Sequence, residues 1–390
     1  MNLKNLKHYE EFYICAYCAY CVNYKSYSAC PTFFTSHHEI STGRGKMITA
    51  RNIAQGVLNK KEGLEALSEG LFSCTFCGAC EKVCIVDIPL TEVYTELKTL
   101  VQDYLPKGTK KVLRYLDESK NIYGMDQEDR NLWNLDVEEI YEEWEKSSSD
   151  IGYFIGCVSS YFTVPGRTPA AILELTKRAD AKISIFSPDE YCCGNPYLLG
   201  GQIEKAKEFA VHNIQVIEKL GIKTLITSCA GCYRVISQEY PKLLGKKLPF
   251  KVITHMEFIY RLIKEGSLKF QSKSALKVSF KDPCELGRHC GVYDIARDLI
   301  NSIPGIENQE LVNNRENALC CGAGGLLKVN HPEMAENIAN ILIKQMEEKN
   351  TEICLNACPS CLFNIDQQLK NQNSKIRAID ISELVLERTS

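Results

Sequence analysis

One pattern of five cysteines occurs twice in this chain, and it constrains the fold more than any other feature. The first copy consists of Cys157, Cys192, Cys193, Cys229 and Cys232, with Gly194 directly after the adjacent pair. The second copy consists of Cys284, Cys320, Cys321, Cys358 and Cys361, with Gly322 directly after its pair. Written as spacings, the copies are C-x34-CCG-x34-C-x2-C and C-x35-CCG-x35-C-x2-C. An internal repeat of this length predicts two similar domains.

Strand-like apolar segments alternate with amphipathic helical segments around these cysteines. In the first copy we expect strands at 151–157, 182–187 and 223–229, and helices at 170–179 and 202–221. In the second copy we expect strands at 276–284 and 351–358 and a helix at 331–350, and the similar segments 250–263 and 374–387 close the two copies. This alternation predicts parallel α/β layers, in which ligands collect beyond the carboxyl ends of the strands. The two copies are therefore expected to face each other about a pseudo-twofold axis, with metal sites between them.

Adjacent cysteines make an unusual demand on the backbone. Successive side chains of an extended strand point to opposite faces, so both thiols can reach one inorganic cluster only if the chain turns there. The glycine that follows each pair permits such a turn. Five thiolates exceed what one zinc ion or one cubane needs, and they suit a larger iron–sulfur assembly. Structural cysteines at chance spacing cannot easily produce the same pattern twice.

Eight further cysteines lie in the first 84 residues. Cys74, Cys77, Cys80 and Cys84 have the C-x2-C-x2-C-x3-C spacing of bacterial ferredoxins, in which the fourth thiolate binds the other cluster of a pair. Zinc ribbons use separated C-x2-C pairs, so zinc is disfavoured. Cys15, Cys18 and Cys21 repeat the triplet, and eight residues separate Cys21 from Cys30. Cross-ligation suggests one 4Fe–4S cluster on Cys15, Cys18, Cys21 and Cys84, and another on Cys74, Cys77, Cys80 and Cys30.

The two patterns account for 18 of the 20 cysteines. Cys290 and Cys354 remain, and we expect both to be buried thiols that pack as small hydrophobes. Two other segments resemble known motifs but fail them. The segment TGRGKM at 42–47 lacks both ends of a phosphate-binding loop, and HHEI at 37–40 lacks the second histidine of HExxH. We expect neither segment to carry chemistry.

Composition excludes several classes of protein. A chain of 390 residues is long enough for two or three domains. Its formal net charge of −3 does not indicate binding to nucleic acid. The amino terminus does not resemble a signal peptide, and no apolar run reaches the ~18 residues of a membrane span. We therefore expect a cytoplasmic chain, whose thiols stay reduced and available to metal. Residues 105–150 contain no cysteine, and we expect helices at 109–121 and 136–146 and a linker at 147–150.

The doubled CCG motif resembles that of heterodisulfide reductase catalytic subunits and their relatives, the CCG-domain iron–sulfur proteins. Together with the cysteines of the first 84 residues, the whole chain resembles the fused type of heterodisulfide reductase subunit. It is also similar to the iron–sulfur subunits of glycolate, lactate and glycerol-3-phosphate dehydrogenases. CPTF at 30–33, GRGKM at 43–47 and NIYG at 121–124 look like segments that this group shares.

The resemblance implies an α/β fold with a helical, ferredoxin-type module that precedes two pseudo-twofold-related CCG domains. The implied boundaries are 1–104 for the two-cluster domain, 105–150 for a helical connector, 151–270 for the first CCG domain and 271–390 for the second. It also implies two cubane 4Fe–4S clusters and two noncubane 4Fe–4S clusters, the latter each held by one complete five-cysteine motif. In heterodisulfide reductases the noncubane clusters face a shared pocket and cleave a disulfide held between them. The ten motif cysteines are therefore the expected catalytic residues.

Two functions stay open at this point. The first is a disulfide reductase subunit that acts on a thiol-cofactor disulfide such as that of coenzymes M and B. The second is an electron-transfer subunit without a substrate of its own, which links a flavin dehydrogenase to a quinone or another carrier. The chain lacks a GxGxxG fingerprint, so its electron donor should be another protein, either a flavoprotein or a membrane cytochrome. Any membrane association would then be made through that partner subunit.

An anionic disulfide would require positive groups near the clusters. The candidates by adjacency to the motif cysteines are Lys281, Arg288, His289, Arg234 and Lys328. The histidines without ligand-like neighbours are expected to be structural, and they are His8, His212, His255 and His331.

Overall fold

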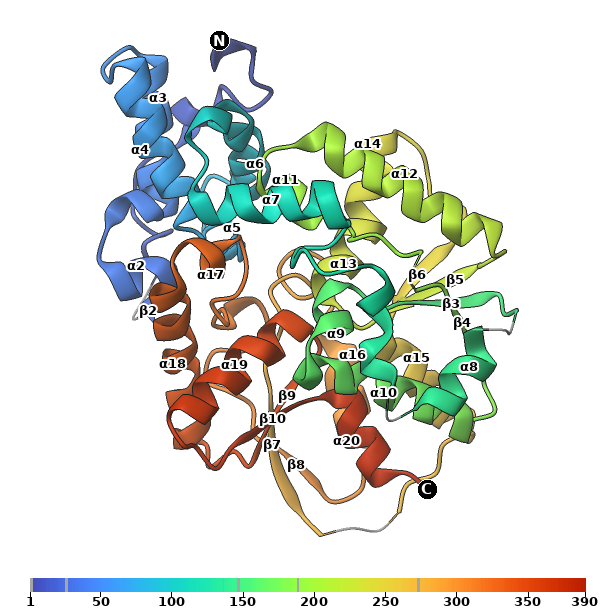
Figure 1. The fold of residues 1–390 in the computed structure, drawn as a ribbon. Coiled ribbons are helices and arrows are strands. Elements are labelled where there is room, and N and C mark those ends of the chain that lie inside the picture. Colours follow the sequence, from blue (N-terminus) through green and yellow to red (C-terminus); the bar gives the residue numbers. More distant parts are fainter. Residues whose placement is uncertain (1–2, 25–26, 136, 146–147, 188, 272–273) are drawn as a thin grey trace. The chain divides into compact units, whose positions relative to one another are not determined.

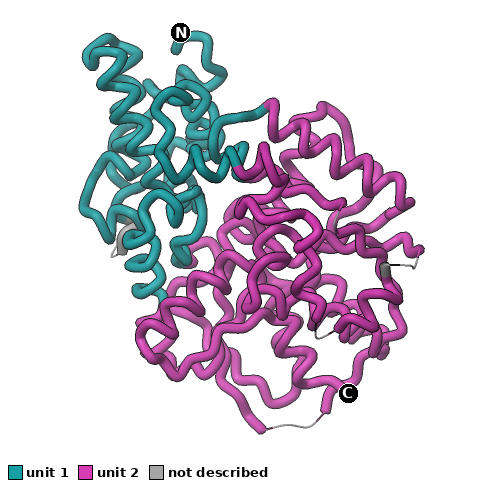
Figure 2. Tube along the Cα trace, in the orientation of Figure 1, with its two compact units in different colours: residues 1–114, 196–203, 319–342 teal, residues 115–195, 204–318, 343–390 magenta. Residues whose placement is uncertain are grey.

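The computed structural model describes residues 3–24, 27–135, 137–145, 148–187, 189–271 and 274–390. The chain divides into two compact units (Figure 2). Unit 1 comprises Met1–Arg114, Pro196–Ile203 and Leu319–Leu342, and unit 2 comprises Tyr115–Asn195, Glu204–Ala318 and Ile343–Ser390. The domain boundaries at 104, 150 and 270 stay a prediction.

The described part of unit 1 is mainly helical (Figure 1). Its helices are α1 (Glu11–Ile14), α2 (Pro31–Ser36), α3 (Gly43–Ala54), α4 (Lys60–Phe72), α5 (Ala79–Lys82), α6 (Leu90–Leu100) and α17 (Leu327–Asn330). The first parts of α7 (Lys107–Ser119) and α18 (Pro332–Glu348) and most of α11 (Asn195–Leu199) also belong to it. Short 3-10 helices span Leu3–Asn5, Glu39–Ser41 and Gln102–Tyr104, and β1 (Asn23–Tyr24) pairs with β2 (Tyr27–Ser28) in an antiparallel hairpin.

Side-chain caps and an apolar core determine the helices of unit 1. Thr42 begins α3, where its hydroxyl accepts a hydrogen bond from the Gly45 amide at 3.0 Å. Asn59 begins α4 in the same way, because its side-chain oxygen accepts from the Glu62 amide at 2.9 Å. Each cap satisfies an amide that the first helical turn leaves without a partner. Helix α4 packs on both α3 and α6, and the contact buries apolar side chains completely, among them Met47, Leu67, Leu71 and Leu97.

Unit 2 contains two four-stranded parallel sheets. The first has the order β4-β3-β5-β6, with β3 (Ile151–Phe154), β4 (Ser184–Ile185), β5 (Thr224–Thr227) and β6 (Lys251–Thr254). The second has the order β8-β7-β9-β10, with β7 (Leu276–Phe280), β8 (Ile306–Asn308), β9 (Ile353–Asn356) and β10 (Arg377–Asp380). The two orders are the same when each sheet is numbered along the chain. The internal repeat and the α/β fold class are thereby confirmed.

Helices connect the parallel strands of both sheets (Figure 1). The first repeat has α9 (Cys157–Tyr161), α10 (Thr163–Arg178), α12 (Ile203–Lys219), α13 (Ala230–Arg234), α14 (Tyr240–Leu244) and α15 (His255–Lys264). The second has α16 (Asp294–Ser302), the rest of α18, α19 (Pro359–Asn371) and α20 (Ile381–Arg388). Helix α8 (Glu138–Glu145) precedes β3, a π-helix spans Val235–Glu239, and 3-10 helices span Glu128–Asn134 and Arg315–Asn317.

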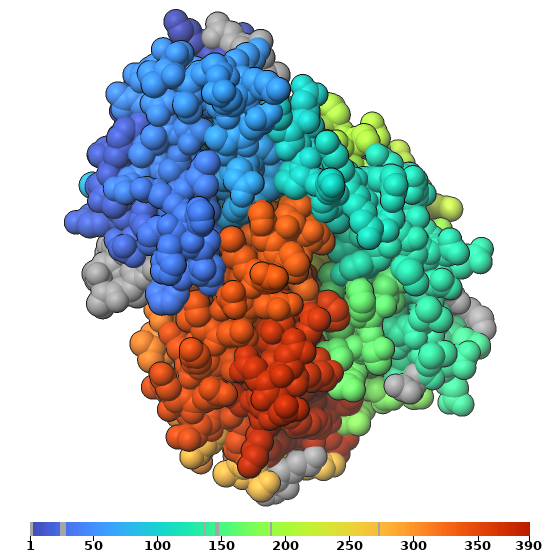
Figure 3. All heavy atoms as spheres, turned by 60° about the vertical axis from the view of Figure 1, so that its left-hand side comes forward, coloured from blue at the N-terminus to red at the C-terminus, as the bar shows by residue number. Residues whose placement is uncertain are grey.

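The two repeats are in contact within unit 2. Helix α10 of the first repeat packs on α19 and α20 of the second, and Figure 3 shows the red carboxyl-terminal residues beside green residues of the first repeat. The His255 Nε2 atom is hydrogen-bonded to Asp380 Oδ1 at 3.0 Å, and each side chain is only 1% exposed. His255 is the first residue of α15, and Asp380 is the N-cap of α20, so the bond joins the starts of two helices that correspond in the two copies. Both helices begin with a capping box.

The elements differ from the sequence expectations in several places. The strand expected at 182–187 is only two residues long, Ser184–Ile185. Between Cys284 and Cys320, where no element was expected, the structure has α16 and β8. Residues 136, 146 and 147, which belong to an expected helix and an expected linker, lie outside the described residues.

Candidate metal centres

Four motif cysteines of unit 2 lie just beyond the carboxyl ends of strands. Cys157 follows β3 and begins α9, and Cys229 follows β5 and begins α13. Since β4 lies on one side of β3 and β5 on the other, the sheet reverses its order between these two strands. A ligand site is expected at such a switch point. In the second sheet Cys284 follows β7, and Cys358 follows β9 and precedes α19.

The adjacent cysteines lie at sharp turns, as the sequence predicted. Gly194, which follows Cys193, has a φ of 86°, and Gly322, which follows Cys321, has a φ of 88°. A side chain at either position would be strained because this is the left-handed region. A Cβ atom on Gly322 would also lie 2.2 Å from the backbone oxygen of Ala335. Only glycine fits this second turn.

The first motif forms a continuous series of thiol contacts in unit 2. Side-chain hydrogen bonds join Cys157 to Cys192, Cys192 to Cys193, Cys193 to Cys232, and Cys232 to Cys229. All five side chains are at most 9% exposed. The structure therefore brings all five residues of this motif together. The series continues to Cys358 of the second motif, which is hydrogen-bonded to Cys229.

Mutual hydrogen bonding shifts the pKa values of these thiols in opposite directions. A hydrogen bond from Cys192 lowers the pKa of Cys157, and bonds from Cys192 and Cys232 hold the pKa of Cys193 well below its usual value. Hydrogen bonds from Cys232 and Cys358 lower the pKa of Cys229 to about 5. The donors Cys192 and Cys232 have pKa values well above the usual range. The lowered pKa values favour the thiolate forms of Cys157, Cys193 and Cys229, and the thiolate is the form that binds metal.

A buried ion pair positions the segment that leads to Cys157 of the first motif. The Glu190 carboxylate accepts hydrogen bonds from the amides of Ile155 and Gly156, each at 2.8 Å, in the segment that leads from β3 to Cys157. Arg130 forms an ion pair with Glu190, and its Nη2 atom also lies 3.9 Å from Cys157 Sγ. Both charged side chains are completely buried. No sequence pattern predicted this pair, because 60 residues separate its members and neither lies in a cysteine motif.

The second motif is divided between the units. Cys284, Cys358 and Cys361 belong to unit 2, whereas Cys320 and Cys321 belong to unit 1. In unit 2, Lys281 Nζ donates a hydrogen bond to Cys361 Sγ at 3.4 Å, and the lysine is only 1% exposed. In unit 1, Cys320 Sγ accepts a hydrogen bond from the Gly322 amide at 3.4 Å.

Of the five positive groups proposed from adjacency, Lys281 has a direct contact with a motif sulfur. Arg234 forms ion pairs with Glu285 and Glu239 and lowers the pKa of Cys193 from a distance. Arg288 donates hydrogen bonds to the carbonyl oxygens of Glu316 and Ala318. Lys328 is partly buried and interacts electrostatically with Cys321, although burial lowers its pKa. His289 is also partly buried.

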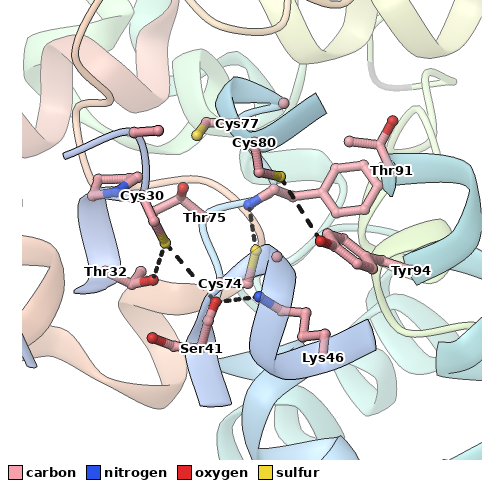
Figure 4. Close-up of a pocket in the computed structure, with 15 residues that line it drawn as sticks. Cys30, Thr32, Ser41, Lys46, Cys74, Thr75, Cys77, Cys80, Thr91 and Tyr94 are labelled. Atoms are coloured by element: carbon pink, nitrogen blue, oxygen red, sulfur yellow. Dashed lines mark hydrogen bonds between the residues drawn. The ribbon is translucent and has the colours of Figure 1, made fainter. Parts of the chain in front are cut away.

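Four cysteines of unit 1 line a single pocket. They are Cys30, which precedes α2, Cys74 and Cys77, which lie between α4 and α5, and Cys80, which lies in α5 (Figure 4). Tyr94 and Thr91 of α6 complete one side, and Tyr94 Oη lies 3.8 Å from Cys80 Sγ. Burial raises the pKa of Cys30 and of Cys80. These are the four residues that cross-ligation assigns to one cluster.

The other four cysteines of unit 1 are closer to solvent. Cys15 interacts electrostatically with Cys84 and Cys18, and Cys21 interacts with Cys15 and Cys18. Cys18 is exposed, and the other three are partly exposed. Burial raises the pKa of Cys21 to about 12, although the Arg44 amide at the start of α3 donates a hydrogen bond to its sulfur.

Two cysteines lie outside these sets. Cys354 is completely buried in β9, and burial raises the pKa of the partly buried Cys290 to about 12. Among the described residues, no group of three or more His, Cys, Asp or Glu side chains is arranged to hold a single metal ion. The ligands of an iron–sulfur cluster surround several iron atoms, so they need not converge on one point. The buried, all-thiol donor sets of the CCG motifs fit such a cluster.

Family models match most of the regions described above. The model of a cysteine-rich CCG domain matches residues 151–237 and 278–366, and that of a 4Fe-4S dicluster domain matches residues 11–88. These matches define a class of iron–sulfur proteins with a ferredoxin-type region and two CCG repeats.

Curated relatives narrow this class. The chain is 32% identical to a Methanosarcina barkeri protein named as a subunit of dihydromethanophenazine:CoB–CoM heterodisulfide reductase. The 330 aligned residues cover 83% of this chain and 79% of that protein. The Methanosarcina mazei protein of the same name is 31% identical over 376 residues, which is 92% of this chain and 90% of the relative. A Syntrophomonas wolfei protein named EtfAB:quinone oxidoreductase is 25% identical over 82% of this chain and 46% of its own length. The chain belongs to the same family as the two Methanosarcina heterodisulfide reductase subunits.

These findings support an iron–sulfur oxidoreductase that transfers electrons. Helices with the length and apolar content of a membrane span do not occur in the part of the chain that the structure describes.

Proposed function

We propose that this chain is the subunit of a multi-protein complex that reduces a disulfide of two thiol cofactors, such as coenzymes M and B. The observation that carries the proposal is the hydrogen bond between Cys229 of the first CCG motif and Cys358 of the second. It brings ligands of the two repeats into contact inside unit 2. Relatives that bear the name of a CoB–CoM heterodisulfide reductase give the substrate class.

Disulfide reduction requires two electrons and two protons, and it breaks one sulfur–sulfur bond to give two thiols. Two CCG clusters, when bound, would supply one electron each. Cys157, Cys192, Cys193, Cys229 and Cys232 would hold the first, and Cys284, Cys320, Cys321, Cys358 and Cys361 would hold the second. The contact between Cys229 and Cys358 supports sites close enough to act on one disulfide.

Residues around the motifs of unit 2 suit an anionic disulfide in a dry site. Lys281 places a buried positive charge against Cys361, and a positive charge favours binding of a negative substrate group. The Tyr123 and Phe162 rings lie 4.6 Å apart and the Phe162 and Phe363 rings 4.7 Å apart, so the connector and both repeats supply one aromatic cluster. Apolar rings exclude water from the neighbouring thiols. Burial raises the pKa of Tyr123, and the neighbouring Cys157, Cys192 and Cys229 raise it further, so its hydroxyl keeps its proton.

Unit 1 would deliver the electrons. One cubane would be held by Cys15, Cys18, Cys21 and Cys84, and the other by Cys30, Cys74, Cys77 and Cys80. Cys18 is exposed, which suits a cluster that accepts electrons from a docked partner protein. A flavoprotein or a membrane cytochrome would be this donor. The chain would act in the cytoplasm, where a membrane partner could hold it at the membrane surface.

A second candidate is an electron-transfer subunit without a substrate of its own. The similarity to a protein named EtfAB:quinone oxidoreductase favours it. Both candidates use the same cysteine ligands, so activity must separate them.

The test is the reduction of the coenzyme M–coenzyme B disulfide by the anaerobic, iron-loaded full chain with reduced viologen as donor. We expect two thiols for each disulfide consumed. Cys358→Ala should lose this activity, whereas Cys290→Ser should keep it, since Cys290 lies outside both motifs. If the wild-type chain oxidises the donor only when a quinone is supplied and forms no thiol, the chain is an electron conduit.

A further inference from the structure

A buried lysine faces the pocket of Cys30, Cys74, Cys77 and Cys80. Lys46 lies in the first turns of α3, is 1% exposed and lines the pocket with these four cysteines (Figure 4). Its Nζ atom donates hydrogen bonds to the backbone carbonyl oxygens of Ser41 and, at 3.3 Å, of Thr42. The same atom lies 5.0 Å from the centre of the Tyr94 ring. These contacts fix the ammonium group beside the thiols.

The charge of Lys46 has no carboxylate partner in the described part of the chain. The two carbonyl oxygens and the aromatic face are polar contacts, but they leave a full positive charge inside unit 1. Burying a charge without an opposite charge is costly, so a buried cation indicates an anion nearby. The nearest anionic candidates are the thiols, because Lys46 acts electrostatically on both Cys30 and Cys80.

The other cysteine set of unit 1 has no comparable cation among the described residues. The positive groups that act on Cys15 and Cys21 are Arg51 and Arg44. Both are partly exposed, and Arg44 already forms an ion pair with Glu39. Solvent and the carboxylate weaken their effect, whereas a buried charge is screened much less. The charge environments of the two sets are therefore unequal.

We propose that Lys46 raises the reduction potential of the cluster held by Cys30, Cys74, Cys77 and Cys80 relative to the cluster held by the other set. An electron added to a thiolate-bound cluster increases its negative charge, and a fixed positive charge beside it favours that reduced state. Electrons that enter at the exposed set would then move to the buried set. The proposal rests on the assignment of two 4Fe–4S clusters to unit 1, and it is independent of whether the CCG motifs reduce a disulfide.

The test is a redox titration of the anaerobic full chain, followed by electron paramagnetic resonance, with Lys46→Gln as the main variant. Glutamine keeps a donor for the Ser41 and Thr42 carbonyls and removes the charge. At a fixed potential, the ratio of reduced to oxidised cluster should fall about tenfold for one ferredoxin-type signal, which equals a shift of about 59 mV for a one-electron couple. The second ferredoxin-type signal should not move.

Two control variants separate charge from packing and burial. Lys46→Arg keeps the charge and should leave the potential near the wild-type value. Lys82→Met removes an exposed lysine that lies two residues from both Cys80 and Cys84, and it should cause little shift because solvent screens the lost charge.

Three results would overturn the proposal. The first is an unchanged midpoint in Lys46→Gln at full iron content. The second is an equal shift in Lys82→Met. The third is a wild-type chain that lacks one of the two ferredoxin-type signals. If Lys46→Gln loses about four iron atoms, the comparison with Lys46→Arg decides: full iron in the arginine variant supports the role of the charge, and the same loss contradicts it.

Discussion

The first CCG motif depends on a charged pair that binds no metal itself. The carboxylate of Glu190 holds the amides of Ile155 and Gly156, and Arg130 compensates the buried negative charge. Both groups are inaccessible to solvent. If one partner were neutral, the other would be a buried charge without compensation. The pair therefore positions Cys157 and stabilises unit 2 at the same time.

Replacing Glu190 with glutamine should lower the free energy of unfolding by about 3–5 kcal/mol, the cost of breaking a buried ion pair from one side. The measurement is the urea midpoint of the anaerobic full chain, followed by cluster absorbance. The exposed pair of Lys205 and Asp117, 2.7 Å apart, is the matched control, and Asp117→Asn should cost no more than about 1 kcal/mol. An equal loss of unfolding free energy in the two variants would contradict the stabilising role of the buried pair of Arg130 and Glu190.

At the scale of elements, the two CCG turns provide a natural comparison. Both glycines have a positive φ, but their surroundings differ. A Cβ on Gly194 would lie 3.4 Å from the Ala206 carbonyl oxygen, whereas a Cβ on Gly322 would lie 2.2 Å from that of Ala335. The first distance is an ordinary contact, and the second requires α18 to move. The turns are alike in backbone conformation and unequal in packing.

We expect Gly194→Ala to lower the free energy of unfolding by about 1–2 kcal/mol, the cost of the left-handed conformation alone. Gly322→Ala should cost more, by about 1–3 kcal/mol, because overpacking is added. Unfolding in urea and the iron content of each variant measure the two effects. An equal or reversed order of stability would show that the close approach of Ala335 does not constrain the second turn.

Sequence patterns predicted the elements that carry strong apolar periodicity and missed weaker or more distant features. The strands before Cys157 and Cys229 are apolar runs that end at a cysteine, and both exist. Strand β8 has three residues and no fully buried side chain, so little pattern marks it. Helix α16 could have been found, since it buries Ala296, Leu299 and Ile300 at helical spacing. The positions of Glu190 and Lys46 depend on tertiary contacts, which no local pattern contains.

At the scale of the whole molecule, the chain combines two kinds of cysteine site. Unit 1 has two sets of four thiols, one buried in a pocket and one closer to solvent. Unit 2 has one complete five-cysteine motif, which is in contact with Cys358 of the second motif. This arrangement suits a reaction that needs two electrons, which iron–sulfur clusters deliver one at a time. We propose that the two CCG motifs hold paired clusters that act on a substrate disulfide.

The most direct test of that claim is the iron and acid-labile sulfide content of the anaerobically purified chain, combined with electron paramagnetic resonance during oxidative titration with coenzyme M. We expect about 16 iron atoms for each chain, from two cubane and two noncubane clusters, and a paramagnetic signal that depends on the added thiol. About eight iron atoms with ferredoxin-type signals alone would contradict the clusters at the CCG motifs. Full iron without a response to the thiol would contradict the action on a disulfide.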